Sequence, residues 1–130
     1  EAAPSDREGS CIVVVATDAP FLPHQLKRLA RRVPMGIART GGTAANGSGD
    51  IFIAFSTANP GVAQSGNDPI TIQMLSNNAE SPFFVATIEA VEEAIINALV
   101  AAQTMTGRNG LTVPALPHDR LRAILTKYNR

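Results

Sequence analysis

The sequence predicts a mixed fold of class α+β, in which two apolar strands lie in one sheet and a long helix packs on that sheet. Strands are expected over residues 11–17 and 50–58, because both are short apolar runs rich in β-branched or aromatic residues and bounded by Gly, Pro and Asp. A helix is expected over residues 82–106, where apolar side chains recur at intervals of three and four.

Burial in this sheet is expected on both faces, as in a sheet that is covered on both sides. The side chains expected to be buried, or to alternate with buried neighbours, are those of Val13, Val15, Ile51 and Ile53. The two strands are expected to lie next to one another.

The composition limits the classes of function. The 130 residues are enough for one domain with a real core, and 45% of them are apolar with a formal net charge of zero, which argues against disorder and against bulk nucleic-acid binding. Without Trp and with one Tyr, a stacking platform for single-stranded nucleic acid is not expected. Cys11 is the only cysteine, which excludes an internal disulfide and favours a small core residue.

No signal peptide is visible at the start, and no apolar run reaches transmembrane length, so no membrane association is expected. The sequence does not indicate a compartment, cytoplasmic or periplasmic. Glu1 need not be the natural start of the gene product.

Residues 1–9 mix charge, Pro and small residues without periodicity and are expected to be a linker. After the first strand, Pro23 suits the first position of a helix, and Pro34 is expected to end or kink that helix. The basic residues on this helix (Lys27, Arg28, Arg31 and Arg32) favour a solvated or subunit-facing side over a phosphate site.

The glycine-dense stretch 40–50 opens directly onto the second strand. A phosphate-binding loop needs a helix after it, so nucleotide binding is rejected. The stretch is expected to bring Ser48 and Asp50 to a strand end, on the same face because they are two residues apart. The alternative interpretation is a simple hairpin-type turn.

Residues 60–81 are expected to be loop-like, with residues 70–75 as a short edge strand or part of a helix. Ser81 is expected to cap the long helix and Gly107 to end it; a turn over 107–110 and a short helix from Pro117 follow. Neither His24 nor His118 has partners at metal-ligand spacing, so no metal or other cofactor is expected, whereas a Ser-His-Asp triad stays open.

The candidate reactive site is the pair Gly9-Ser10, which leads straight into the first strand, with Ser10 expected at the first residue of that strand. If the bond before Ser10 were cut, Ser10 would carry its own general base, because an α-amino group has an unperturbed pKa of about 7.7–8.0. On residue types alone, an ordinary turn before a strand is the favoured interpretation of the pair.

Three stretches resemble one family: Gly9-Ser10 with residues 12–20 and 25–32, Asn46-Gly-Ser-Gly-Asp50 with the strand after it, and residues 104–110 with Pro117 and Leu121. They are similar to the small subunit of the L-aminopeptidase/D-amino-acid esterase-amidases and β-peptidyl aminopeptidases. The resemblance covers nearly the whole chain from Ser10 onward. It implies an αββα sandwich, with two sheets between helix layers, similar to N-terminal nucleophile hydrolases but differently connected.

The resemblance implies that residues 10–130 are a small catalytic subunit sharing one domain with a large subunit from the same precursor. Ser10 matches the nucleophile, Gly9 the residue before the self-cleaved bond, and Ser48 and Asp50 the polar pair beside it. Some members have Glu at the position of Asp50, whose expected role is to orient the free amine or Ser48. At least one of this pair is therefore expected within hydrogen-bond reach of Ser10 or its nitrogen.

The implied reaction is acyl transfer from short peptides, amides or esters to the Ser10 hydroxyl, with release by water. An Asn of the large subunit would contribute to the oxyanion hole, and the heterodimers would assemble into larger oligomers. Two alternatives remain: an acyltransferase like ornithine acetyltransferase, which uses Thr as its nucleophile, and an inactive structural subunit.

A mature small subunit would start at Ser10, but Ser10 is internal in this chain. Either the Gly9–Ser10 bond is uncut, or the chain is a precursor segment, or residues 1–9 are the tail of the large subunit. The sequence does not choose among these.

Overall fold

The computed structural model describes residues 9–64 and 66–130, so residues 1–8 of the expected linker lie outside the described residues. In order, the main elements are β1 (Ile12–Thr17), α1 (Pro23–Ala30), α2 (Val33–Arg39), β2 (Ile51–Ser56), α3 (Ser81–Ala101), β3 (Met105–Thr106), β4 (Thr112–Val113) and α4 (His118–Lys127). The chain divides into two compact units, Glu1–Glu92 and Glu93–Arg130, which are described separately. The mixture of helices and sheet confirms the predicted α+β class.

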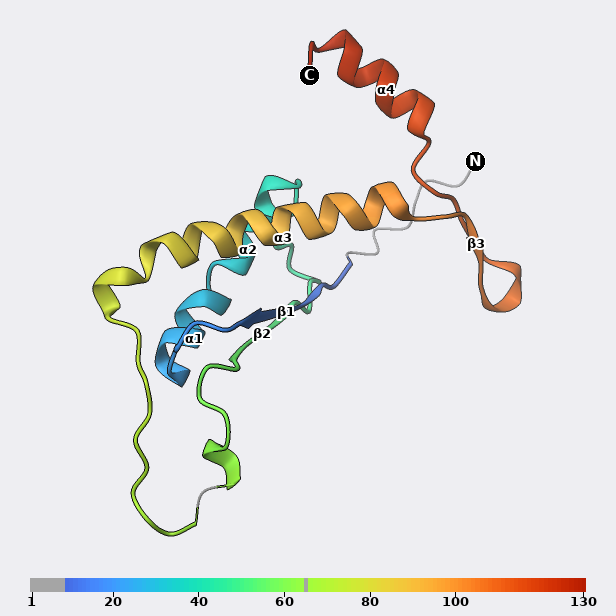
Figure 1. Cartoon of the computed structure of the whole chain (residues 1–130). Helices are drawn as coiled ribbons and strands as arrows, with labels where there is room; N and C mark the ends of the chain where they lie inside the picture. The colour runs from blue at the N-terminus through green and yellow to red at the C-terminus, as the bar shows by residue number, and fades with distance from the viewer. Residues whose placement is uncertain (1–8, 65) are drawn as a thin grey trace. The chain divides into compact units, whose positions relative to one another are not determined.

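Strands β1 and β2 form a parallel pair in which Ile12 stands opposite Ile51 and Thr17 opposite Ser56 (Figure 1). The prediction that the two strands are neighbours is therefore confirmed. A hairpin is excluded, because hairpin strands are antiparallel and the connection here contains α1 and α2.

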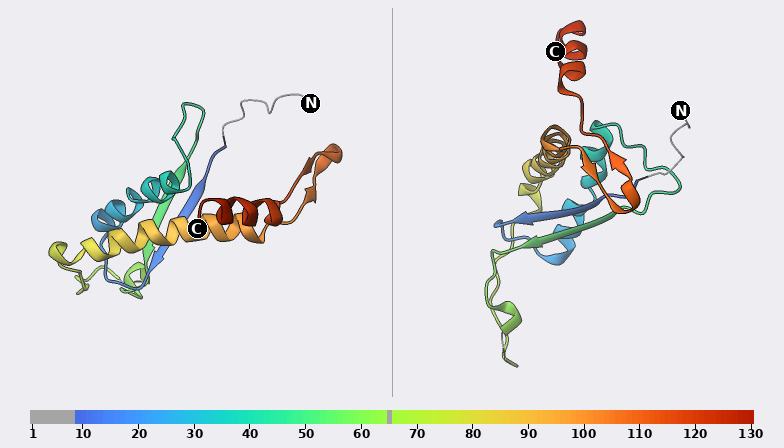
Figure 2. Two further views of the ribbon diagram at one scale, coloured as in Figure 1. Left: turned by 90° about the horizontal axis from the view of Figure 1, so that it is seen from above. Right: turned by 90° about the vertical axis from the view of Figure 1, so that its right-hand side faces the viewer.

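Helices cover one face of this sheet. Exposure alternates along both strands, and the half-buried set includes Val15 and Ala54. Ala54 packs against the core that Phe21 and Leu29 form, together with Phe83 from the start of α3. Figure 2 (left) shows α1, α2 and the first half of α3 lying over the two strands.

The other face of the sheet is bare within the described residues of the first unit. Its side chains are apolar and exposed, from 70% for Ile12 to 44% for Phe55; the others are Val14, Ile51 and Ile53. The expectation of burial on both faces is thus met on the helix side only. Val13 and Val15 are half-buried, whereas Ile51 and Ile53 are not.

Helices α2 and α3 cross at a glycine. A Cβ atom on Gly36 would lie 2.7 Å from both the Ile88 carbonyl oxygen and the Val91 Cβ, far inside van der Waals contact. Only glycine therefore fits here, and it lets α3 approach α2 closely enough to bury Val91.

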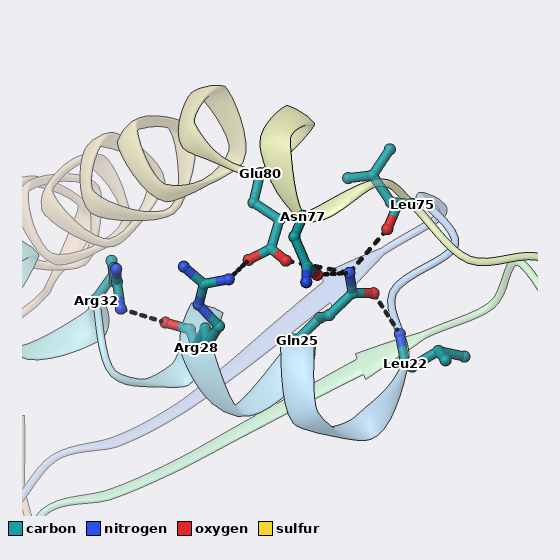
Figure 3. Close-up of polar contacts among 7 residues, drawn as sticks. All are labelled: Leu22, Gln25, Arg28, Arg32, Leu75, Asn77 and Glu80. Carbon is teal, nitrogen blue, oxygen red and sulfur yellow. Dashed lines mark hydrogen bonds and ion pairs between the residues drawn. The ribbon is translucent and has the colours of Figure 1, made fainter.

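A buried polar network joins α1 to the segment before α3, near the carboxyl end of β1 (Figure 3). The Gln25 amide nitrogen donates to the Leu75 carbonyl at 2.8 Å, to Asn77 Oδ1 at 2.8 Å and to Glu80 Oε1 at 3.1 Å. The Gln25 amide oxygen accepts from Leu22 N–H at 3.0 Å. Each polar atom of this fully buried side chain is thus satisfied.

The buried carboxylate of Glu80 is neutralised from α1. An Arg28 guanidinium nitrogen lies 2.8 Å from Glu80 Oε2, out of line for a hydrogen bond, so charge attraction holds this pair. Arg28 and Arg32 also lie over the Phe84 ring, at 5.1 Å and 3.9 Å from its centroid. Part of the predicted basic cluster therefore packs on α3.

Two predictions about loops and ends are corrected. Residues 70–75 form neither a strand nor a helix; Asn59 holds them by accepting from Gln73 N–H at 2.8 Å and donating to the Gln73 carbonyl at 3.0 Å. Strand β1 starts at Ile12, so Ser10 lies two residues before the strand and not on it, and Cys11 is half-buried.

In the second unit, α3 ends at Ala101 and not near Gly107 as predicted. Met105 and Thr106 pair antiparallel with Val113 and Thr112, and this pairing takes residues that would otherwise extend the helix. The turn predicted over 107–110 is present between the two strands, and helix α4 begins at His118. In the described residues, no helix is long and apolar enough to cross a membrane.

Candidate active site

The candidate site lies where the amino ends of β1 and β2 meet. Because the two strands are parallel and Ile12 stands opposite Ile51, the residues just before each strand come to the same sheet edge. Gly9 and Ser10 precede β1, and Ser48, Gly49 and Asp50 precede β2. The structure therefore brings together every residue that the sequence assigned to the site.

The Ser10 hydroxyl and the Gly9 carbonyl each contact the glycine-rich loop. Gly49 N–H donates a hydrogen bond to Ser10 Oγ at 3.0 Å. Ser48 Oγ donates to the Gly9 carbonyl oxygen at 3.3 Å, at the long end of the range for a hydroxyl donor. Two successive loop residues thus hold the two sides of the Gly9–Ser10 bond. Ser48 binds the Gly9 carbonyl, and Gly49 binds the Ser10 hydroxyl.

Asp50 binds the residue after Ser10. Its Oδ1 accepts a hydrogen bond from Cys11 N–H at 2.7 Å, and the N–H of the following Ile51 donates to the Cys11 carbonyl at 3.0 Å. Both backbone polar groups of Cys11 are therefore fixed to the start of β2. The Asp50 carboxylate thus binds Cys11 N–H, whereas its expected partners were the Ser10 amine or Ser48.

The solvent exposure of these groups suits a reaction with an external substrate. Ser10 is exposed, whereas Ser48 and Asp50 are half-buried. A half-buried carboxylate with a short hydrogen bond to the backbone is a rigid support. The exposed hydroxyl is the group that is free to react.

Sequence reasoning did not single out Gly49. The glycine density of the stretch indicated that backbone would approach closely here, but not which glycine does so. The signal that would have found it is its place between Ser48 and Asp50, both already assigned to the site.

The histidines do not enter these contacts. The ring of His118 lies 2.9 Å from the Val100 carbonyl oxygen in the second unit, and the bonds of Ser10 and Asp50 go to backbone N–H groups. Across the described residues, no group of three or more His, Cys, Asp or Glu side chains is placed to hold a metal ion.

Comparison with known families decides the assignment. The model of peptidase family S58 matches residues 1–113. The chain belongs to peptidase family S58. This agrees with the family resemblance found in the sequence.

Individual S58 relatives extend the likeness. The chain is 56% identical over 128 residues to the β-peptidyl aminopeptidase BapA of Sphingosinicella microcystinivorans, which covers 98% of this chain and 32% of that protein. It superposes with a TM-score of 0.81 and 48% identity on the L-aminopeptidase D-Ala-esterase/amidase of Ochrobactrum anthropi, covering 92% of this chain and 34% of that one. That structure is described as a prototype for the serine aminopeptidases and a new variant of the N-terminal nucleophile hydrolase fold.

A β-aminopeptidase of a Burkholderia species superposes with a TM-score of 0.79 and 45% identity, over 89% of this chain and 34% of that one. The S58 chain described here therefore spans about a third of the length of the relatives it matches. Its fold is that of the corresponding part of these aminopeptidases.

Proposed function

We propose that this chain is the nucleophile-bearing part of a self-processing aminopeptidase that releases amino-terminal residues from short peptides, amides or esters. Ser10 is its nucleophile, and Gly9–Ser10 is the bond that is cut first. The observation that supports this most is the placement of the Ser48 hydroxyl on the carbonyl of that bond, with Ser10 Oγ held one residue away.

The proposed self-cleavage uses this geometry. Ser10 Oγ attacks the Gly9 carbonyl carbon and gives up its hydroxyl proton, the Gly9–Ser10 C–N bond breaks, and the Ser10 nitrogen takes up that proton and becomes an amine. The resulting ester between Gly9 and Ser10 Oγ is then hydrolysed by water. Ser48 donates to the Gly9 carbonyl oxygen, where negative charge develops, and a donor placed at that atom stabilises the transition state.

Turnover uses the same hydroxyl. Ser10 Oγ attacks the substrate carbonyl, and the freed α-amine, assisted by Ser48, accepts the hydroxyl proton and returns it to the leaving amine. Water then releases the acyl group from Ser10. Once Gly9 has left, the Ser48 hydroxyl is free to serve the substrate in its place.

Asp50 supports both reactions without touching the reacting atoms of the uncut chain. Its bond to Cys11 N–H fixes the backbone next to Ser10. Asp50 therefore acts through Cys11, as a positioning residue.

The rest of the protein completes the site and the fold. We infer that a large subunit, cut from the same precursor, lies on the bare sheet face and forms the second sheet of an αββα sandwich. Two properties support this: the apolar character of that face, and a chain length about a third that of the relatives. Heterodimers of this kind would then assemble into oligomers.

An assay with aminoacyl-nitroanilides, with and without an acetyl donor, tests the proposed activity on the full-length protein. A serine aminopeptidase releases nitroaniline at a rate that does not depend on the donor. Transfer of acetyl groups without hydrolysis would indicate the acyltransferase, and no reaction of either kind would indicate a structural subunit.

A further inference from the structure

We propose that Gly49 is a further catalytic residue, whose backbone N–H holds Ser10 Oγ for both attacks and whose lack of a side chain leaves room for that hydroxyl. The inference rests on the proposed function, since it concerns the same nucleophile. The acting group is the backbone N–H of Gly49, in the loop before β2.

The hydrogen bond determines which lone pair of Ser10 attacks. A serine hydroxyl has two lone pairs and one proton. At 3.0 Å the Gly49 N–H occupies one lone pair, leaving the second for the carbonyl carbon and the proton for the base. The bond also stabilises negative charge on Oγ, both as its proton leaves and when the acyl-enzyme is hydrolysed and Oγ is the leaving group, because bonds to ionised acceptors are stronger.

A side chain at position 49 would crowd the Ser10 hydroxyl. A Cβ atom on Gly49 would lie 3.2 Å from Ser10 Oγ and 3.9 Å from Ser10 Cβ. Gly49 does not have a positive φ, so its own backbone conformation does not require glycine. The nearby Ser10 hydroxyl is what a side chain here would displace.

The carboxyl side of the loop is fixed to β1, which limits how far residue 49 can move away from Ser10. On its carboxyl side, Asp50 and Ile51 bind the N–H and carbonyl of Cys11 at 2.7 Å and 3.0 Å, and β2 continues in register with β1. A methyl group on residue 49 would therefore press on Ser10 Oγ and shift it from the position in which Gly49 N–H holds it.

The test compares Gly49→Ala with Gly66→Ala in the full-length protein. Gly66 is the matched control, because a Cβ atom there would meet nothing within 4 Å and its φ is not positive. Gly49→Ala is expected to lower both the rate of self-cleavage and kcat by on the order of 10²-fold, the effect of a misplaced reacting group, with little change in KM. Gly66→Ala is expected to match the wild type in cleavage, kcat and thermal unfolding.

A second variant separates the hydrogen bond from the crowding. Glycolic acid at position 49, introduced by in vitro translation, replaces the N–H with an ester oxygen and adds no bulk, and it is also expected to slow cleavage and turnover. It decides the matter if Gly49→Ala fails to fold. Wild-type rates of cleavage and hydrolysis in either folded variant would overturn the role of Gly49 and leave the proposed function standing. A wild-type protein that neither cleaves itself nor hydrolyses the substrate would overturn the proposed function.

Discussion

The carboxylate of Asp50 and the backbone N–H of Cys11 are joined by a 2.7 Å hydrogen bond, one residue after the proposed nucleophile. Asp50→Ala removes this bond, and hydrogen bonds to charged groups contribute about 1.5–3 kcal/mol. We expect the free energy of unfolding to fall by about that amount, and kcat to fall more than KM rises, because Ser10 loses its support. Asp50→Asn retains an acceptor oxygen, so its stability and its kcat should lie between those of the wild type and of Asp50→Ala. Chemical denaturation and steady-state kinetics measure both effects, and a wild-type kcat for Asp50→Ala would remove Asp50 from the mechanism.

Ser48→Ala is expected to slow self-cleavage and to lower kcat by about 10²–10⁴-fold, with a smaller effect on KM, since proton transfer contributes about this much. The matched control is Ser56→Ala. Ser56 Oγ donates to the Ala19 carbonyl at 2.6 Å at the other end of β2, so its loss should lower thermal stability and leave kcat unchanged. Unchanged turnover in Ser48→Ala, measured with an aminoacyl-nitroanilide, would contradict the assigned role.

Gln25→Leu is expected to destabilise the fold without changing the chemistry. It leaves Asn77, Glu80 and the Leu75 carbonyl without their shared donor, and an unpaired buried polar group costs about 1–3 kcal/mol. The network lies near the carboxyl end of β1, whereas Ser10 lies before its amino end, so kcat should be unchanged in the folded protein. The control is His24→Leu, at the exposed neighbouring position. Equal unfolding temperatures for the two variants would show that the network does not stabilise the fold.

Ile53→Asp is expected to prevent assembly of the full-length protein. Ile53 is 52% exposed in this chain, but on the proposed sandwich it is buried, where an unpaired charge is strongly unfavourable. Lys27→Asp, on exposed α1 surface, controls for the added negative charge. Size-exclusion chromatography should find Ile53→Asp dissociated or aggregated and Lys27→Asp assembled. A normally assembled Ile53→Asp protein would show that this sheet face stays open.

Much of the sheet could be predicted from the sequence, because its signals are local. The runs of Ile, Val and Phe in β1 and β2 have strong strand preference, and Pro23 and Ser81 stand at helix starts. The end of α3 was predicted wrongly, because Met105 and Thr106 pair with β4 and do not extend the helix. The helical periodicity of a segment carries no information on its pairing with another segment.

The residues of the site could be predicted from the sequence, but the contacts of their side chains could not. Ser10, Ser48 and Asp50 were assigned through the family resemblance, and parallel pairing accounts for their meeting at one sheet edge. The partners of the three side chains are backbone groups of Gly9, Cys11 and Gly49. Every residue has such groups, so no pattern of side chains could indicate them.

The state of the Gly9–Ser10 bond tests the central claim most directly. Intact-mass measurement and N-terminal sequencing of the active full-length protein should find a chain that begins at Ser10, because only a freed α-amine, with a pKa of about 7.7–8.0, provides the local base. Ser10→Ala should abolish both cleavage and hydrolysis, since one hydroxyl performs both attacks, whereas Ser10→Cys is expected to cleave but to turn over amides poorly. Hydrolysis by a preparation in which the Gly9–Ser10 bond is wholly intact would contradict the account.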